Sequence, residues 1–178
     1  MALSASNRVS SFPPVAAADA RVLVLGSMPG VASLSAQRYY AHPRNAFWPL
    51  MGELLGFDPQ LDYERRLAAL RRAGVALWDV LGHCERPGSL DADIVRDSCV
   101  PNDFAGFFNT HPQVRAVFFN GNTAAQAFRR QVLPTLTANS LALHTLPSTS
   151  PAHAGLSFAR KRAAWQALAD ALQRPAQG

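Results

Sequence analysis

The sequence predicts an α/β protein, a three-layer α/β/α domain with a central four-stranded parallel sheet. Four short apolar runs indicate buried strands, segments with helical spacing of apolar residues separate them, and Gly or Pro stands at most of their ends. Strands that alternate with helices are typical of a parallel sheet covered on both faces. We expect a single domain over residues 21–173, because 178 residues are enough for one sizeable core.

The strands are predicted from apolar runs that are rich in Val, Leu and Phe. A short continuous run of this kind is typical of a strand buried on both faces of a parallel sheet. The expected strands cover residues 22–25, 75–80, 114–119 and 141–146. Ligands of open α/β sheets bind at the carboxyl ends of the strands, so the loops that follow these four runs are the first place to look for a site.

The helices are predicted from apolar residues at three- and four-residue spacing. They are expected over residues 47–55, 62–72, 102–108, 124–133 and 158–172. Gly56 and Gly74 follow the first two of these segments and end them in the usual C-terminal manner. Asn102 is a candidate cap for the third. The arginines of the second segment are expected to form a solvated face, although some could contact a polyanionic partner.

The N-terminal residues 1–20 are predicted to be a flexible arm, because they are rich in Ser, Ala and Pro and the adjacent Pro13 and Pro14 disfavour a helix. They lack the apolar core of a signal peptide, and no stretch of the chain is long and apolar enough for a membrane span. We therefore expect a cytoplasmic protein, and no feature of the sequence requires more than a monomer.

The composition is that of a globular protein with a basic balance. Apolar residues make up 48% and charged residues 16% of the chain, and the formal net charge is +5. This charge permits a polyanionic partner without requiring one. Cys84 and Cys99 are the two cysteines, neither in a CxxC pair, so they cannot supply the four ligands of a structural metal site. No metal and no cofactor are expected.

The strongest functional signal lies between residues 21 and 48. The first strand ends at Gly26 and leads into Ser27-Met28-Pro29-Gly30, and the sequence YYAHPRNAFW follows. The loop is neither a GxGxxG fingerprint nor a P-loop, because the required Gly and Gly-Lys-Ser/Thr residues are absent. Adjacent tyrosines beside an amide and cations suit a flat heterocycle attached to phosphate.

These residues resemble the first motif of the uracil-DNA glycosylase superfamily, and LPSTSPAH at residues 146–153 resembles its second. The two motifs lie about a hundred residues apart in the expected order, and the hypoxanthine-DNA (deoxyinosine) glycosylase branch is the most similar. The resemblance implies the same four-stranded parallel fold. It also implies DNA containing a deaminated base as the partner, and hydrolysis of a base–sugar bond after the nucleotide is flipped out.

The resemblance also implies roles for individual residues at the base. Tyr40 would stack on the flipped base, with Tyr39 as the second choice. Gly26 ends the strand, and backbone groups of Ser27 and Met28 would face the base. Asp79, at the carboxyl end of the second strand, would contact a base edge; its alternative role is to cap the following turn. A carboxylate could accept the N1–H of hypoxanthine and reject adenine, which lacks that proton.

The second motif would contact the DNA backbone. Ser148, Thr149 and Ser150 are expected to hold phosphates, and His153 would contact phosphate or assist the leaving group. Ser148 occupies the position where many superfamily members have a His or Asn that stabilises the departing base. A Ser hydroxyl donates only one hydrogen bond and carries no charge, so it is a weaker electrophile.

Met28 departs from the pattern of the uracil-specific relatives, which carry an Asp or Asn there to position the water. The hypoxanthine branch shares this loss and relies on the Asn of the His-Pro-x-Asn element, which is Asn45 here. We therefore expect Asn45 to be the principal catalytic residue; its alternative role is to cap the next helix. Lys161 is the only Lys and starts the last helix, so lyase chemistry through a Schiff base is not expected.

Two other functions remain open at this point. One is a mismatch-specific uracil-DNA glycosylase, against which Met28 argues. The other is a DNA-binding module that keeps the fold and the stacking residues but has no catalysis.

Overall fold

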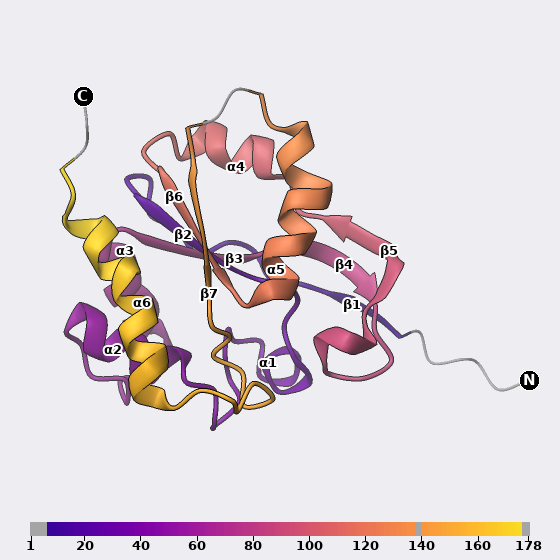
Figure 1. The fold of residues 1–178 in the computed structure, drawn as a ribbon, viewed down its shortest axis with the longest axis horizontal. Helices are drawn as coiled ribbons and strands as arrows, with labels where there is room; N and C mark the ends of the chain where they lie inside the picture. Colours follow the sequence, from indigo (N-terminus) through magenta and orange to yellow (C-terminus); the bar gives the residue numbers. More distant parts are fainter. Residues whose placement is uncertain (1–6, 138–139, 176–178) are drawn as a thin grey trace, which may run out of the picture.

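The computed structural model describes residues 7–137 and 140–175 (Figure 1). Its central sheet is parallel throughout, with the strand order β3-β2-β6-β7. The strands are β2 (Val22–Gly26), β3 (Val75–Asp79), β6 (Ala116–Asn120) and β7 (Ala142–Leu146). All four apolar runs of the sequence form strands within two residues of their expected bounds, and the predicted sheet is confirmed.

Helices cover both faces of this sheet. One face is covered by α2 (Phe47–Leu55), α3 (Tyr63–Ala73) and α6 (Phe158–Gln173), and the other by α4 (Phe104–Thr110) and α5 (Asn122–Ala127). Alternate residues of each strand supply the two cores. In β2, Val22 and Val24 face the first group of helices, whereas Leu23 and Leu25 face the second. This period of two is why an uninterrupted apolar run is needed in a central strand.

The helix ends follow local chemistry, with two differences from expectation. Asp103, not Asn102, caps α4 by accepting from the Gly106 N–H, while the Asn102 amide donates to the Asp79 carbonyl. The predicted helix 124–133 is split, because α5 continues as a π-helical turn (Phe128–Val132) and a 3₁₀ turn (Leu133–Thr135). Gly56 and Gly74 end α2 and α3 in the left-handed conformation, as predicted.

A second, antiparallel sheet was not predicted. It consists of β1 (Arg8–Ser10), β4 (Leu81–Glu85) and β5 (Val95–Pro101), in the order β1-β4-β5. The sequence pattern did not predict β4 and β5, because residues 82–98 are polar. A sheet with one face in solvent needs few apolar residues.

The flexible arm predicted for residues 1–20 is wrong for residues 8–20. Strand β1 pairs with β4, and Val15 exchanges two backbone hydrogen bonds with Leu77, at 2.9 and 2.8 Å. The side chains of Val15 and Ala20 are buried. Backbone pairing of so short a segment leaves little pattern in the side chains, so the sequence did not reveal it. Residues 1–6 lie outside the described residues.

An additional short helix, α1 (Val31–Ala36), connects the loop after β2 to the two tyrosines of the first motif. The loops that follow β2, β6 and β7 therefore gather at one edge of the sheet, beside the end of β3. Across the described parts of the chain, none of the helices has the length and apolarity that a bilayer crossing requires.

Candidate active site

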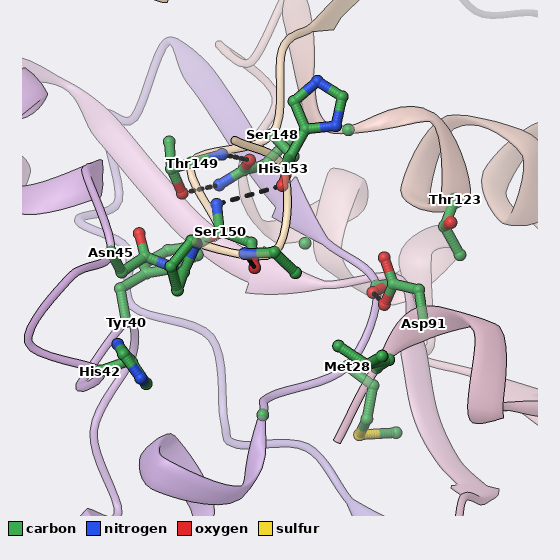
Figure 2. Close-up of a pocket in the computed structure, with 18 of the residues that line it drawn as sticks. Met28, Tyr40, His42, Asn45, Asp91, Thr123, Ser148, Thr149, Ser150 and His153 are labelled. Atoms are coloured by element: carbon green, nitrogen blue, oxygen red, sulfur yellow. Dashed lines mark hydrogen bonds between the residues drawn. The ribbon is translucent and has the colours of Figure 1, made fainter. Parts of the chain in front are cut away.

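A cavity of about 1010 Å³ lies at the carboxyl edge of the parallel sheet. It is lined by the loops after β2, β6 and β7, the end of β3, the first-motif residues 39–45 and the turn 89–92. Figure 2 shows Tyr40, His42 and Asn45 on one side of it, and Met28, Asp91 and Thr123 on the other. The structure therefore brings both sequence motifs to one cavity, although they are far apart in the chain.

The floor of the cavity combines one carboxyl oxygen and one phenol oxygen that have no hydrogen-bond partner among the described residues. Asp79 Oδ2 and Tyr40 Oη are both buried, and neither makes a hydrogen bond to any residue that the structure describes. Gly26 lies directly against them: a Cβ at this position would be 2.6 Å from Asp79 Oδ1 and 3.3 Å from Tyr40 Oη. Glycine is needed here because a methyl group would displace the carboxyl. Buried polar groups without partners are rare. Two such groups that lie close together suit a polar ligand.

Burial controls the ionisation of both groups. It raises the pKa of Asp79 to about 7; the negative charge of Asp91 adds to the rise and Arg86 opposes it. Burial, together with the charge of Asp79, raises the pKa of Tyr40 far above its ordinary value, and the nearby Asn120 amide offsets this only partly. Tyr40 therefore remains a hydrogen-bond donor, while Asp79 changes charge near neutral pH.

Tyr40 is held in a strained backbone conformation, with φ of +54°. Its neighbours fix that conformation: the Ala41 N–H donates to Ser33 Oγ at 3.1 Å, and the Tyr39 N–H donates to the Tyr63 hydroxyl at 2.9 Å. The ring of Phe47 stacks on Tyr40 at 4.0 Å and 25°. A base could therefore use only the opposite face of Tyr40. Strain maintained by surrounding contacts is common at functional sites.

Tyr39 has a structural role. Its side chain is buried, its hydroxyl donates to the Pro13 carbonyl at 2.9 Å, and its carbonyl accepts from the Trp48 indole at 3.1 Å. Its ring meets Phe12 edge to face. These contacts attach the first motif to the N-terminal segment that the sequence failed to place.

Asn45 lies just before α2, whose N-cap is Ala46 and not Asn45, and its catalytic role stays a prediction. Its Oδ1 accepts from the Phe47 N–H at 3.0 Å at the start of α2, and this bond fixes the plane of the carboxamide. The side chain also lines the cavity. The second lone pair of Oδ1 and the two N–H groups are therefore presented in a set orientation, which suits a group that positions water or a base.

The second-motif loop is fastened to β6 through Thr149. Its backbone N–H donates to Asn120 Oδ1, and the Asn120 amide donates to Thr149 Oγ1, both at 2.9 Å. Thr149 is buried, although it belongs to the cavity lining, and its hydroxyl accepts a hydrogen bond within the protein. These bonds attach the loop to β6, and the phosphate contact expected of Thr149 stays a prediction. Ser148 and Ser150 line the cavity, with the Ser150 N–H donating to Ser148 Oγ at 3.2 Å.

His153 lies at the exposed end of the same loop and lines the cavity. The ammonium of Lys161 donates to the His153 carbonyl at 2.9 Å, and burial lowers the pKa of this lysine. Lys161 is not among the residues that line the cavity. Lys161 therefore stabilises the second-motif loop without facing the cavity.

The backbone carbonyls at the start of the first loop accept hydrogen bonds within the protein. Those of Gly26 and Ser27 accept from the N–H groups of Val80 and Leu81, at 2.8 and 3.1 Å. Each of these carbonyls keeps a second lone pair, and the contact of the loop backbone with a base stays a prediction. The Met28 side chain is buried, with part of it in the core between the sheet and α5.

Asp91 is the cavity residue that sequence reasoning missed. It belongs to the 3₁₀ turn Asp91–Asp93 between β4 and β5, and its Oδ1 accepts from Ser27 Oγ at 2.5 Å. Buried Arg86 holds the same region by donating to the Pro29 carbonyl at 2.7 Å and to the Gly88 carbonyl at 2.9 Å. A contact across 64 residues between two loops leaves no local signal in the sequence.

The chain matches a known protein family over most of its length. The family model of the uracil DNA glycosylase superfamily matches residues 13–169. A relative named hypoxanthine DNA glycosylase from Methanosarcina acetivorans is 34% identical over 158 residues, 88% of this chain and 95% of that protein. Another of the same name from Methanosarcina barkeri is 38% identical over 116 residues, 65% of this chain and 72% of that protein.

A solved structure supports the same conclusion. The solution NMR structure of a provisionally named uracil DNA glycosylase from Methanosarcina acetivorans matches with a TM-score of 0.79 and 31% identity. The match covers 94% of this chain and 99% of that one. Sequence and fold agree over nearly the whole domain, and the chain belongs to the uracil DNA glycosylase superfamily.

Proposed function

We propose that this protein is a monofunctional DNA glycosylase that releases hypoxanthine from deoxyinosine in DNA. The observation that carries the proposal is the cavity floor, where a buried carboxyl and a buried phenol lack partners among the described residues. The names of the two relatives favour the same substrate. The protein would act as a cytoplasmic monomer without metal or cofactor.

The floor suits the edge that deamination creates. Hypoxanthine presents an N–H donor at N1 beside a carbonyl acceptor at O6, and adenine presents the reverse, an acceptor at N1 beside an amino donor. We assign the N1–H to Asp79 and O6 to the Tyr40 hydroxyl, so Tyr40 would meet the edge of the base in place of stacking on its face. Ionised Asp79 cannot donate to N1 of adenine, so adenine would leave buried groups unpaired, which costs about 1–3 kcal/mol per group. Uracil carries the same donor and acceptor pair and is the second candidate substrate.

The reaction at C1′ forms a bond to a water oxygen and breaks the bond to N9, whose electron pair leaves with the base. The departing hypoxanthine is an anion, and Ser148 and the Tyr40 hydroxyl are the neutral donors near it. Asn45 would orient the water, because its carboxamide is fixed by the Phe47 N–H. The proton of the water needs an acceptor, which Met28 and Asn45 do not supply.

We assign that acceptor role to Asp91. It is a carboxylate on the cavity wall, joined through Ser27 to the same loop that carries Met28. Figure 2 shows it on the side of Met28, across the cavity from Asn45. A carboxylate from a distant turn would then replace the missing one in the first motif.

Asp91→Asn is expected to lower the single-turnover excision rate about 100-fold, within the range of one general base. It should also lower the pKa of Asp79, because the charge of Asp91 raises it. Asp93→Asn is the matched control, because Asp93 lies on the same turn and its carboxylate accepts from the Leu90 N–H. Equal rates for Asp91→Asn and the wild type would remove Asp91 from the mechanism.

Tyr40→Phe separates the hydroxyl from the ring. Loss of a hydrogen bond to O6 is expected to lower the excision rate about tenfold, since such a bond contributes about 1 kcal/mol or somewhat more. The ring and its contact with Phe47 are unchanged by this substitution. Single-turnover kinetics on deoxyinosine DNA measure the effect. A full rate would show that Tyr40 acts through its ring face alone.

The proposed activity is tested with labelled oligonucleotides that carry one deoxyinosine or one deoxyuridine, followed by alkali to cut abasic sites. We expect cleavage of the deoxyinosine strand with little cleavage of deoxyuridine, and no borohydride-trapped complex. Strong deoxyuridine cleavage would favour the uracil alternative. Binding without release of either base would indicate the catalytically silent module and contradict the proposal.

A further inference from the structure

A second cavity, of about 310 Å³, lies behind the wall of the first. The two cavities share four lining residues, Tyr39, Tyr40, His42 and Asn45. The remaining lining of the second includes Arg38, which immediately precedes Tyr39, and Arg66 of α3. A ligand in the second cavity would therefore touch the segment that carries the proposed stacking and catalytic residues.

The two arginines surround one aromatic ring. The guanidinium carbons of Arg38 and Arg66 lie 5.4 and 5.6 Å from the centroid of the Tyr63 ring, and Arg66 is also 4.7 Å from the centroid of Trp48. These rings hold the guanidinium groups in place without neutralising them. Arg66 is therefore not simply part of a solvated face, and the alternative that some arginines of this helix contact DNA applies to it.

Neither Arg38 nor Arg66 forms an ion pair in the described part of the protein, although the charge of Asp62 partly favours the charged form of Arg66. The ion pairs there join Arg65 to Asp62 and Arg162 to Glu53, and neither involves Arg38 or Arg66. The buried Nε of Arg66 has no hydrogen-bond partner within residues 7–137 and 140–175. Burial and the charge of Arg38 lower the pKa of Arg66. A buried donor without an acceptor is costly, so an anion that supplies one would be favoured.

We propose that Arg38 and Arg66 bind a backbone phosphate of the lesion strand, close to the flipped nucleotide. Guanidinium groups present paired N–H donors that match phosphate oxygens. The shared wall would place this phosphate within a few nucleotides of the base in the first cavity. The proposal deepens the proposed function, because it assumes that DNA occupies that cavity.

The experiment measures DNA affinity against salt concentration for Arg38→Gln, Arg66→Gln and the control Arg65→Gln. Arg65 is the neighbour of Arg66 on α3, is exposed and is paired with Asp62, and its substitution removes the same charge. Each of the two test variants is expected to bind about tenfold more weakly at moderate salt. The slope of log K against log salt should become shallower by about 0.7–0.9 for each phosphate that the variant no longer binds. Arg65→Gln should change neither quantity.

Neutral methylphosphonates placed one at a time on either side of deoxyinosine locate the bound phosphate. At one of these positions the methylphosphonate should weaken DNA binding by the wild type. The same methylphosphonate should not weaken binding by Arg66→Gln any further, because the substitution and the neutral phosphate remove the same interaction. Thermal unfolding checks that Arg66→Gln is folded. If it is not, Arg38→Gln gives the same test, because Arg38 is exposed. Base release with unchanged slopes in Arg38→Gln and Arg66→Gln would overturn the phosphate site alone. Changed slopes without any base release would support the site and contradict the glycosylase proposal.

Discussion

Asn45→Ala is expected to lower the single-turnover rate on deoxyinosine DNA by about 100- to 1000-fold, the usual effect of losing one preorganised donor at a reacting centre. The carboxamide is fixed through the bond from the Phe47 N–H to Oδ1 and lines the cavity, so the substitution removes a group that is already oriented. DNA affinity should stay within a few fold, because the expected phosphate contacts lie elsewhere. Rapid-quench kinetics at saturating enzyme measure the rate.

The same substitution also removes a bond at the start of α2, so its control must preserve that bond. Asn45→Ser keeps a side-chain oxygen for the Phe47 N–H but loses the amide. Asn45→Ala should lower the free energy of unfolding by about 1 kcal/mol and Asn45→Ser by less, while both lose the rate. Normal binding together with a full rate in Asn45→Ala would restrict Asn45 to its structural role.

The sequence predicted the parallel sheet because its signal is local and strong. Each central strand is buried on both faces, so its residues are apolar without interruption, as in Val22 to Leu25. The antiparallel sheet lacks this signal. Its strands are short and partly exposed, and β1 is defined by pairing with residues more than seventy positions away. Such pairing is a tertiary property that a single sequence does not display.

The site was predictable to the extent that its residues belong to motifs. Tyr40, Asn45, Asp79 and Ser148 all line the cavity, although their roles remain predictions. Asp91 was not predictable, because a single Asp in a polar segment resembles any solvated acid until the fold brings it to Ser27. The attachment of the second-motif loop through Thr149 was not predictable for the same reason. A hydroxyl in a loop looks available until the fold pairs it with Asn120.

Discrimination between deoxyinosine and deoxyadenosine should depend on pH through Asp79, whose pKa burial raises to about 7. The carboxylate can only accept, so it pairs with the N1–H of hypoxanthine and rejects N1 of adenine. The neutral acid can donate as well, and it would then match both bases. We therefore expect the ratio of the two excision rates to rise as pH increases from 6 to 8. Asp79→Asn, which donates and accepts at every pH, should show a low ratio that does not change with pH.

The same residue links function to stability, with a sign that follows from its pKa. The carboxyl has a pKa of about 7 in the native state, against an ordinary 3.8, so the native state binds more protons between these values. Wild-type stability should therefore fall as pH rises through this window, by up to about 4 kcal/mol. Asp79→Asn lacks this titration and should be more stable than the wild type at pH 8.5, with a smaller difference at pH 5. Urea unfolding at the two pH values measures the difference. An equal difference at both would mean that Asp79 is ionised throughout, and its selectivity for hypoxanthine should then be independent of pH as well.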